Sequence, residues 1–188
     1  MAQSLPSKDL TSSQLRILDA ARNLFSEHGV GSTSLQMIAD AVGVSKAAIY
    51  HQYKAKEDIV YAVGEQINMA LAIMTSIALQ EATLAKRREV LLNQIINLAV
   101  ENRTIAGRLQ QDPHFLKLFR EEPPFVDVMA KLENTFIGNS PKPASRAVVA
   151  MLITGIAGAV MHPICDDLDN HALRLHLTKA ANALIKLL

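Results

Sequence analysis

The sequence predicts an all-α protein in which a small N-terminal helical domain is followed by a larger helical domain. Apolar residues recur at helical spacing along nearly the whole chain, whereas the alternating pattern of β-strands is nearly absent. Capping residues, glycines and prolines divide this pattern into separate helices. With 188 residues, of which 49% are hydrophobic, the chain is long and apolar enough to bury a core.

Local start and stop signals set the expected helix boundaries. The first helix is expected to begin after Thr11, which forms a capping box with Gln14, and to end at Gly29. The second is expected to begin at the cap Thr33 and to run to about residue 42. The remaining helices are expected at about residues 46–53, 56–81, 87–104, 113–120, 124–137, 143–162 and 168–187.

Residues 35–54, LQMIADAVGVSKAAIYHQYK, are typical of two short helices joined by a tight turn. Ala39 is expected where the two helices cross, since a larger side chain would push them apart. Gly43 is expected at the turn, where a positive φ costs glycine least. Ile49 would fill the small core beneath, which leaves the outer face of the second helix polar. A short helix of this kind fits the major groove of DNA.

The outer face of that second helix carries candidate DNA contacts. Its projecting residues are expected to be Lys46, Ala47, Tyr50, His51 and Lys54. Ser45 and the free amides at the N-terminus of the helix favour a phosphate. The segment therefore predicts a helix-turn-helix for double-stranded DNA.

The segment 16–63 resembles the DNA-binding region of the TetR (tetracycline-repressor-like) family. The shared marks are LFxxxG at residues 24–29, Thr33, IAxxxGVS at 38–45, IYxxY at 49–53 and KE at 56–57. Many fixed positions make this far more specific than a bare helix-turn-helix. The rest of the chain resembles the family only in being all-helical and of suitable length. The resemblance divides the chain into a DNA-binding domain, residues 1–56, and an effector-binding and dimerisation domain, residues 57–188.

The resemblance also implies roles for individual residues. The residues implied to lie nearest the bases are Lys46, Ala47, which would reach a thymine methyl, and His51. The implied phosphate contacts are Thr33, Tyr50 and Lys56, and Gln36 is implied to reach a phosphate or a base edge.

Two positions depart from the family's pattern. Ala55 stands where Ser or Asn often caps the fourth helix, so we expect a cap weaker by about 1 kcal/mol. Glu57 and Asp58 would partly compensate through the helix dipole. Tyr53 replaces the commoner Phe.

In the family the helices after the fourth enclose an effector pocket, which implies a pocket in the larger domain. The wall candidates are Met69, Ile73, Leu98, Phe115, Phe119, Phe125 and Met129, and the candidate polar anchors are Asn97, Asn102, Arg103 and His114. A mostly apolar pocket with few polar groups suits a hydrophobic or amphipathic small molecule. Ordinary core packing is the alternative for each phenylalanine.

The last two long helices, at about 143–162 and 168–187, resemble the family's dimerisation pair. The interface candidates are Met151, Gly155, Ala159, Leu173, Leu177 and Leu184. Two helices from each of two chains would form a four-helix bundle with an isologous interface. Burial within one chain is the alternative.

These expectations combine into a homodimeric regulator of a pseudo-palindromic operator, most simply a repressor that a small molecule releases. One alternative is a regulator that does not respond to a small molecule. Another is a metal sensor that uses the cluster His162, Cys165, Asp166, Asp167 and His171. The irregular spacing of this cluster favours an ordinary interhelical turn without metal.

Missing motifs and the chain's composition argue against several other classes of protein. The sequence has no nucleotide-binding glycine loop, no nucleophile elbow and no paired histidines at metal spacing, so we expect no enzyme and no cofactor. No uninterrupted apolar run of about 18 residues and no signal peptide are seen, and the single Cys165 fits a reducing cytoplasm. The net charge of +1 does not by itself indicate a nucleic-acid partner.

Overall fold

The computed structural model describes residues 10–103, 112–119, 122–138 and 142–188. Within these ranges every regular element is a helix, which confirms the predicted all-α class. The helices are α1 (Ser12–Ser32), α2 (Leu35–Val42), α3 (Lys46–Gln52), α4 (Lys56–Leu79), α5 (Leu84–Glu101), α7 (Pro113–Phe119), α8 (Pro123–Ile137), α9 (Pro143–Ala159) and α10 (Asn170–Ile185), with a 3₁₀ turn at Pro163–Cys165.

The caps at the start of the chain explain where the first helices begin. The predicted capping box is present, because the Thr11 hydroxyl accepts from the Gln14 amide at 3.2 Å and the Gln14 side chain accepts from the Thr11 amide at 3.0 Å. α1 does not stop at Gly29, where φ is 79°, but resumes and ends at Ser32. The cap of α2 is Ser34 rather than the predicted Thr33.

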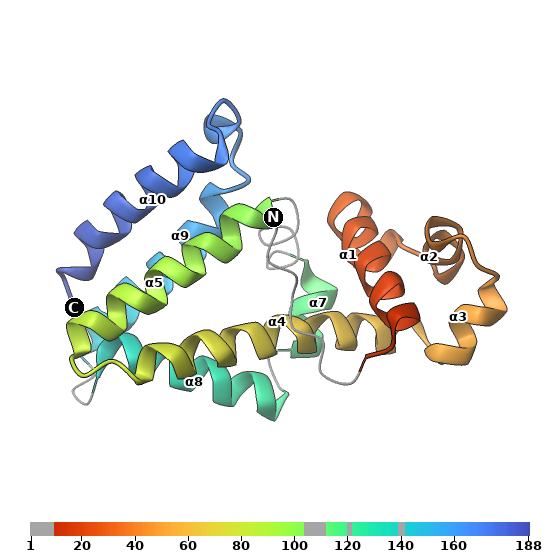
Figure 1. Cartoon of the computed structure of the whole chain (residues 1–188), viewed down its shortest axis with the longest axis horizontal. Helices are drawn as coiled ribbons and strands as arrows, with labels where there is room; N and C mark the ends of the chain where they lie inside the picture. Colours follow the sequence, from red (N-terminus) through yellow and green to blue (C-terminus); the bar gives the residue numbers. More distant parts are fainter. Residues whose placement is uncertain (1–9, 104–111, 120–121, 139–141) are drawn as a thin grey trace.

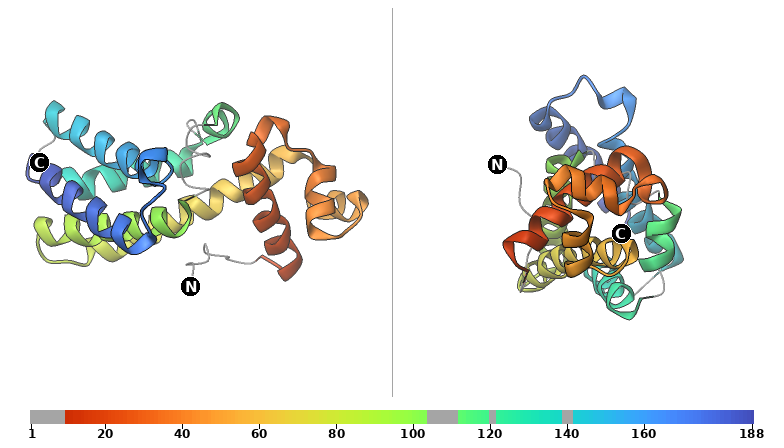
Figure 2. Two further views of the ribbon diagram at one scale, coloured as in Figure 1. Left: turned by 90° about the horizontal axis from the view of Figure 1, so that it is seen from above. Right: turned by 90° about the vertical axis from the view of Figure 1, so that its right-hand side faces the viewer.

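α1, α2 and α3 form an N-terminal module at one end of an elongated molecule, and α5, α8, α9 and α10 lie toward the other end (Figure 1). α4 runs from the module into the larger group of helices, and α7 lies beside α1 (Figures 1 and 2). α4 packs against α1, α5, α7 and α8. α4 is therefore the long connection between the two ends.

The module is built around its own hydrophobic cluster, which we call the N-terminal cluster. It contains Leu18, Phe25, Ile38 and Ile49, each at most 1% exposed. Other members come from outside α1–α3: Ile59, Val60 and Val63 of α4, and Phe115 of α7. The first turns of α4 therefore pack with the N-terminal module, although the predicted division at residue 56 places them in the larger domain.

A second cluster, the C-terminal cluster, lies around α5. Its largest fully buried side chains are those of Leu91, Leu92, Ile96, Leu132 and Phe136, from α5 and α8. α9 and α10 add further buried residues to this cluster. Burial of this much apolar surface is the main favourable contribution to folding of the larger domain.

By length and composition α4 would be able to cross a membrane, since an 18-residue window in it has a mean hydropathy of 1.3. Glu65, Gln66 and Asn68 interrupt the apolar residues of α4, so the sequence has no unbroken apolar run of that length here. In the described structure 44% of that window is buried, and α4 contributes to both clusters. The apolar character of α4 is explained by its place in the core.

Candidate nucleic-acid interface

α2 and α3 meet at the predicted tight turn. Ala39 is fully buried at the point where the helices cross. Gly43 adopts the left-handed conformation, with φ 75° and ψ 38°, and its amide donates to the Asp40 carbonyl at 3.2 Å. Within the part of the chain that the structure describes, a Cβ built on Gly43 would have no neighbour within 4 Å, so the need for glycine comes from the backbone conformation and not from crowding.

α3 has one buried side and one exposed side. Ile49 is fully buried, and the Ser45 hydroxyl caps the helix by accepting from the Ala48 amide at 3.2 Å. Four of the five residues predicted to project are exposed on α3: Lys46, Ala47, Tyr50 and His51. The fifth, Lys54, is exposed just beyond the end of the helix. The structure therefore brings the candidate base-contacting residues together on one short, exposed helix.

Lys46 and Tyr50 are neighbours on this surface. The Lys46 ammonium lies 5.8 Å from the centre of the Tyr50 ring, within the range of a cation–π contact. The Lys54 ammonium lies 3.4 Å from the Tyr50 carbonyl. The Tyr50 side chain stays 43% exposed, so it is available to a partner. Two positive charges thus lie near Tyr50, one at its exposed ring and one at its backbone carbonyl.

Thr33 is placed differently from the implied phosphate contact. Its side chain is 2% exposed, and its hydroxyl donates to the carbonyls of Gly29 at 2.9 Å and Leu24 at 3.3 Å. These bonds satisfy carbonyls at the break in α1. In this arrangement the Thr33 side chain is a structural brace and does not face a partner.

Lys56 also has a structural role in this arrangement. Its ammonium is hydrogen-bonded to the carbonyls of Val30 at 2.8 Å and Gly31 at 3.3 Å. These bonds use two of the three N–H donors of the ammonium, so one donor is left for the implied phosphate contact. Gln36 is exposed on α2, and its amide donates to the Asp40 carboxylate at 2.7 Å.

The role of Arg16 and the direct hydrogen bonds of Asp58, which was expected to act through the helix dipole, were not identified from the sequence. The Arg16 guanidinium of α1 donates to the Val42 carbonyl at 2.8 Å and so satisfies the C-terminal end of α2. At α4 the Asp58 carboxylate accepts from the amides of Lys54 and Ala55, each at 2.9 Å. The missing side-chain cap at Ala55 is therefore compensated by direct hydrogen bonds, in addition to the expected dipole effect. An acidic residue three positions into a helix is the sequence signal for this.

The predicted pocket residues do not gather in one place. Phe125 and Met129 line a groove of about 480 Å³ between α8 and α9, together with Val149 and Ile153. Phe115 packs in the N-terminal cluster, which favours the core-packing alternative for this residue. Four other candidates lie elsewhere: Met69 is half-buried, Ile73 is 46% exposed, Leu98 packs on the C-terminal cluster and His114 is exposed. The side chain of Phe119 lies outside the described residues.

The two polar anchors at the end of α5 bond to backbone. The Asn102 amide donates to the Leu98 carbonyl at 2.9 Å. The Arg103 guanidinium donates to the carbonyls of Val160 at 3.0 Å, Leu168 at 2.8 Å and Cys165 at 3.0 Å. Arg103 thus holds the connection between α9 and α10 and does not serve as a free anchor.

The candidate dimer residues divide into exposed and buried sets. Met151 is 59% exposed and Gly155 is exposed, whereas Ala159 is half-buried. Leu173 is 2% exposed and packs in the C-terminal cluster of its own chain, so it is not available to a second chain. The half-buried Leu177 and Leu184 also pack against that cluster.

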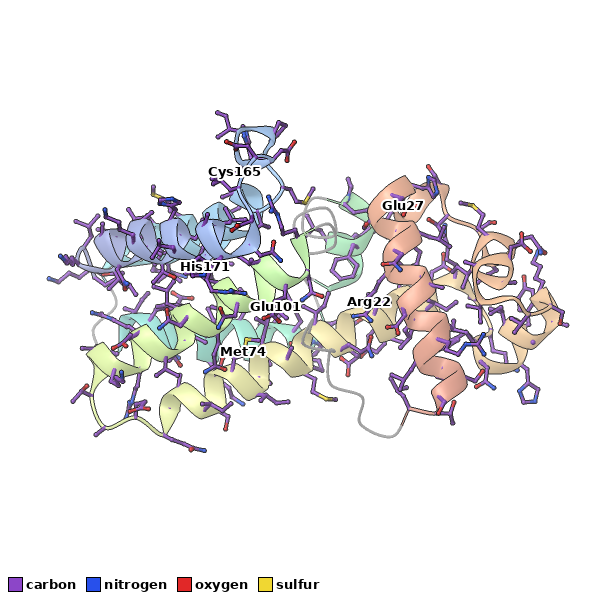
Figure 3. All side chains as sticks on the ribbon, turned by 45° about the horizontal axis from the view of Figure 1, so that its top comes forward. Arg22, Glu27, Met74, Glu101, Cys165 and His171 are labelled. Atoms are coloured by element: carbon purple, nitrogen blue, oxygen red, sulfur yellow. The ribbon has the colours of Figure 1, made fainter. Side chains whose placement is uncertain are left out.

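The cluster between α9 and α10 does not form a metal site. Cys165 is half-buried in the turn before α10, and His171 lies on α10 (Figure 3). The His162 Nδ1 accepts from the Ile164 amide at 3.3 Å. Within the described ranges no three His, Cys, Asp or Glu side chains are grouped so as to hold a metal ion. The metal-sensing alternative therefore has no ligand set here.

Comparison with known proteins shows that the first part of the chain is similar to bacterial transcriptional regulators. Residues 17–63 match the profile described as bacterial regulatory proteins, tetR family. The HTH-type transcriptional repressor Rv1474c of Mycobacterium tuberculosis is 28% identical over 114 residues, which are 60% of this chain and 59% of that protein. The HTH-type transcriptional regulator AcrR of Shigella flexneri is 56% identical over 43 residues, 23% of this chain and 20% of that protein. The chain thus spans about three fifths and one fifth of these two relatives.

Solved structures extend the likeness to the whole fold. The ketosteroid transcriptional regulator KstR2 of Mycobacterium tuberculosis superposes with a TM-score of 0.73 and 15% identity, covering 97% of each chain. AmtR of Mycobacterium smegmatis superposes with a TM-score of 0.71 and 24% identity, covering 96% of this chain and 89% of that one. At these identities the likeness shows the fold.

Proposed function

Because the chain belongs to the tetR family of bacterial regulatory proteins, we propose that it is a DNA-binding transcriptional regulator that acts in the cytoplasm. The single observation that carries this proposal is the exposed face of α3. A capped helix of seven residues presents Lys46, Ala47, Tyr50 and His51 together. Such a helix enters the major groove with its N-terminal residues at the base edges, while cations hold the flanking phosphates. No catalytic step is assigned to the chain.

We assign DNA binding to residues 1–56 and effector binding and dimerisation to residues 57–188. Relatives that are named as transcriptional repressors support repression, and not activation, as the direction of regulation. The apolar groove between α8 and α9, lined by Phe125, Met129, Val149 and Ile153, supports a hydrophobic or amphipathic effector. α4 contributes to both hydrophobic clusters, so a ligand that moves α4 changes the orientation of the N-terminal module.

A homodimer would place two copies of α3 in successive major grooves of a pseudo-palindromic operator. The exposed apolar residues Met151 on α9 and Leu175 on α10, 59% and 58% exposed, support an interface on these helices. The exposed Gly155 on α9 would allow a helix of a second chain to approach closely.

The test is binding of the full chain to DNA fragments selected from a random-sequence pool, measured at two salt concentrations. Tyr50→Ala and Lys46→Ala should each weaken binding about tenfold or more. Lys46→Ala should also reduce the slope of log affinity against log salt by about one, because it removes one positive charge from the DNA-facing surface. Lys131→Ala, which removes an exposed positive charge from α8, is the matched control and should change neither quantity.

Two results would contradict the proposal. A pool that yields no enriched sequence would show that the chain has no specific DNA target. Equal losses in Lys46→Ala and Lys131→Ala would show that the binding reports general charge and not the surface of α3. If specific binding is found, hydrophobic small molecules can be screened for release of the same DNA.

A further inference from the structure

Asp112, which lies directly before α7, joins two elements that are far apart in the sequence. One oxygen of its carboxylate, Oδ1, caps α7 by accepting from the amides of His114 at 2.9 Å and Phe115 at 3.1 Å. The other oxygen, Oδ2, accepts from the amide of Val30 in α1 at 2.8 Å. A single side chain thus fixes the start of α7 to the end of α1.

Side-chain packing supports the same junction. Phe115 of α7 is 7% exposed and belongs to the N-terminal cluster, and α7 lies beside α1 in two views (Figures 1 and 2). The approach is close, because a Cβ built on Gly31 would lie 3.2 Å from the His114 Nε2. Glycines at the end of α1 therefore leave room for α7.

The segment held by Asp112 leads directly into α2. The carbonyl of Val30, the residue whose amide Asp112 binds, accepts from the Lys56 ammonium of α4 at 2.8 Å. The Thr33 hydroxyl donates a hydrogen bond to the Gly29 carbonyl, and the next residue, Ser34, caps α2. The position of α2 and α3 relative to α4 thus depends on bonds at this segment, and one of them comes from Asp112.

We infer that Asp112 is a positioning residue for DNA binding, through which α7 forms a second connection, beside α4, between the larger domain and the N-terminal module. The inference rests on the proposed function for its DNA readout. Asp112 touches no DNA in this scheme. It acts by holding the Val30 amide, and a shift of α7 would pass through this bond to α2 and α3.

Asp112→Asn separates the two roles of the carboxylate. Asn caps helices as well as Asp does, so its carbonyl oxygen can keep the α7 cap. Its second atom is an amide nitrogen, which donates and cannot accept the Val30 N–H. We expect affinity for selected operator DNA to fall about tenfold, the effect of losing one charge-assisted hydrogen bond. The matched control is Asp169→Asn, the same change at the N-cap of α10, which should leave the affinity unchanged.

A second readout does not depend on DNA. Hydrogen exchange of the Val30 amide, followed by NMR, should be at least tenfold faster in Asp112→Asn, whereas amides in the middle of α1 should exchange as in the wild type. Gly31→Ala is an independent variant, because its methyl group would press on the His114 ring. It should lower operator affinity, and the double variant Gly31→Ala with His114→Ala should recover it.

We expect Asp112→Asn to show faster Val30 exchange together with weaker operator binding. We expect Asp169→Asn to show neither change. Unchanged or tighter operator binding by Asp112→Asn, or an equal loss in Asp169→Asn, would overturn the inference. If the random-sequence pool yields no enriched DNA, Val30 exchange still tests the junction, and a rate in Asp112→Asn equal to that of the wild type would refute it.

Discussion

At the scale of single residues, Tyr53 is an unusual member of the N-terminal cluster. It is 7% exposed, and its hydroxyl has no hydrogen-bond partner among the described residues. A buried hydroxyl without a partner costs free energy of folding. We expect Tyr53→Phe to raise the free energy of unfolding by about 1 kcal/mol, measured by urea denaturation. The exposed Tyr50→Phe is the control and should change it by less than about 0.5 kcal/mol. A lower stability of Tyr53→Phe would show that the hydroxyl has a partner in solution.

The same side chain predicts a pH dependence. Burial raises the pKa of Tyr53 above its ordinary value of about 10. A group whose pKa is raised on folding contributes stability below its unfolded pKa and loses it as pH rises. The wild type should therefore lose stability above about pH 10 more steeply than Tyr53→Phe does. Parallel curves of unfolding free energy against pH for the two proteins would contradict this.

The sequence predicts residue roles well where the determinant is local. Gly43, the Thr11 capping box and the exposed side of α3 all depend on neighbours within a few positions. Thr33 and Lys56 were assigned to phosphates by resemblance, yet their partners in the structure are backbone carbonyls at the end of α1. The break at Gly29 exposes those carbonyls, and no local pattern in the sequence shows which side chain will reach them.

At the scale of elements, the connection between α9 and α10 depends on Arg103. Its three hydrogen bonds reach carbonyls on both sides of the turn. Removing it leaves half-buried carbonyls without a donor, so Arg103→Ala should lower the free energy of unfolding by roughly 2 kcal/mol, measured in urea. Arg146→Ala removes an arginine from an exposed ion pair with Glu133 and should cost less than about 1 kcal/mol. Equal costs in the two variants would show that the turn does not depend on Arg103.

Helix boundaries were predicted to within a few residues because caps, glycines and prolines act locally. The placement of α7 was not predicted. Its Phe115 was assigned to a ligand pocket, yet the side chain packs with α1 and α4 in the N-terminal cluster. A pair of phenylalanines four residues apart indicates one apolar helix face, but the partner of that face is decided by long-range packing.

At the scale of the whole molecule, two hydrophobic clusters share α4, and α7 adds a second contact with the N-terminal module. The N-terminal module follows a motif with fixed spacing, so its fold and exposed surface were predictable. The groove between α8 and α9 was predicted only through Phe125 and Met129. Its shape depends on how two helices from separate parts of the chain pack, and helical periodicity does not determine this.

The proposed dimer makes a prediction about Gly155 on α9. A Cβ built on Gly155 meets no atom within 4 Å among the described residues, so Gly155→Ala should stabilise the isolated chain by up to about 1 kcal/mol through helix propensity. In a dimer that packs closely at this point, the methyl group would separate the helices. We therefore expect Gly155→Ala to weaken dimerisation about tenfold in sedimentation equilibrium, while thermal unfolding at low protein concentration shifts upward.

The two measurements have opposite signs only if a second chain lies against Gly155. Ser76→Ala, at an exposed position of α4, is the control for helix propensity and should leave dimerisation unchanged. If Gly155→Ala stabilises the chain and the dimerisation constant stays at the wild-type value, the interface lies elsewhere. Because operator binding requires two correctly spaced modules, the variant should also bind a palindromic operator more weakly at low protein concentration and recover as concentration rises. A loss that does not recover would indicate a change within each chain.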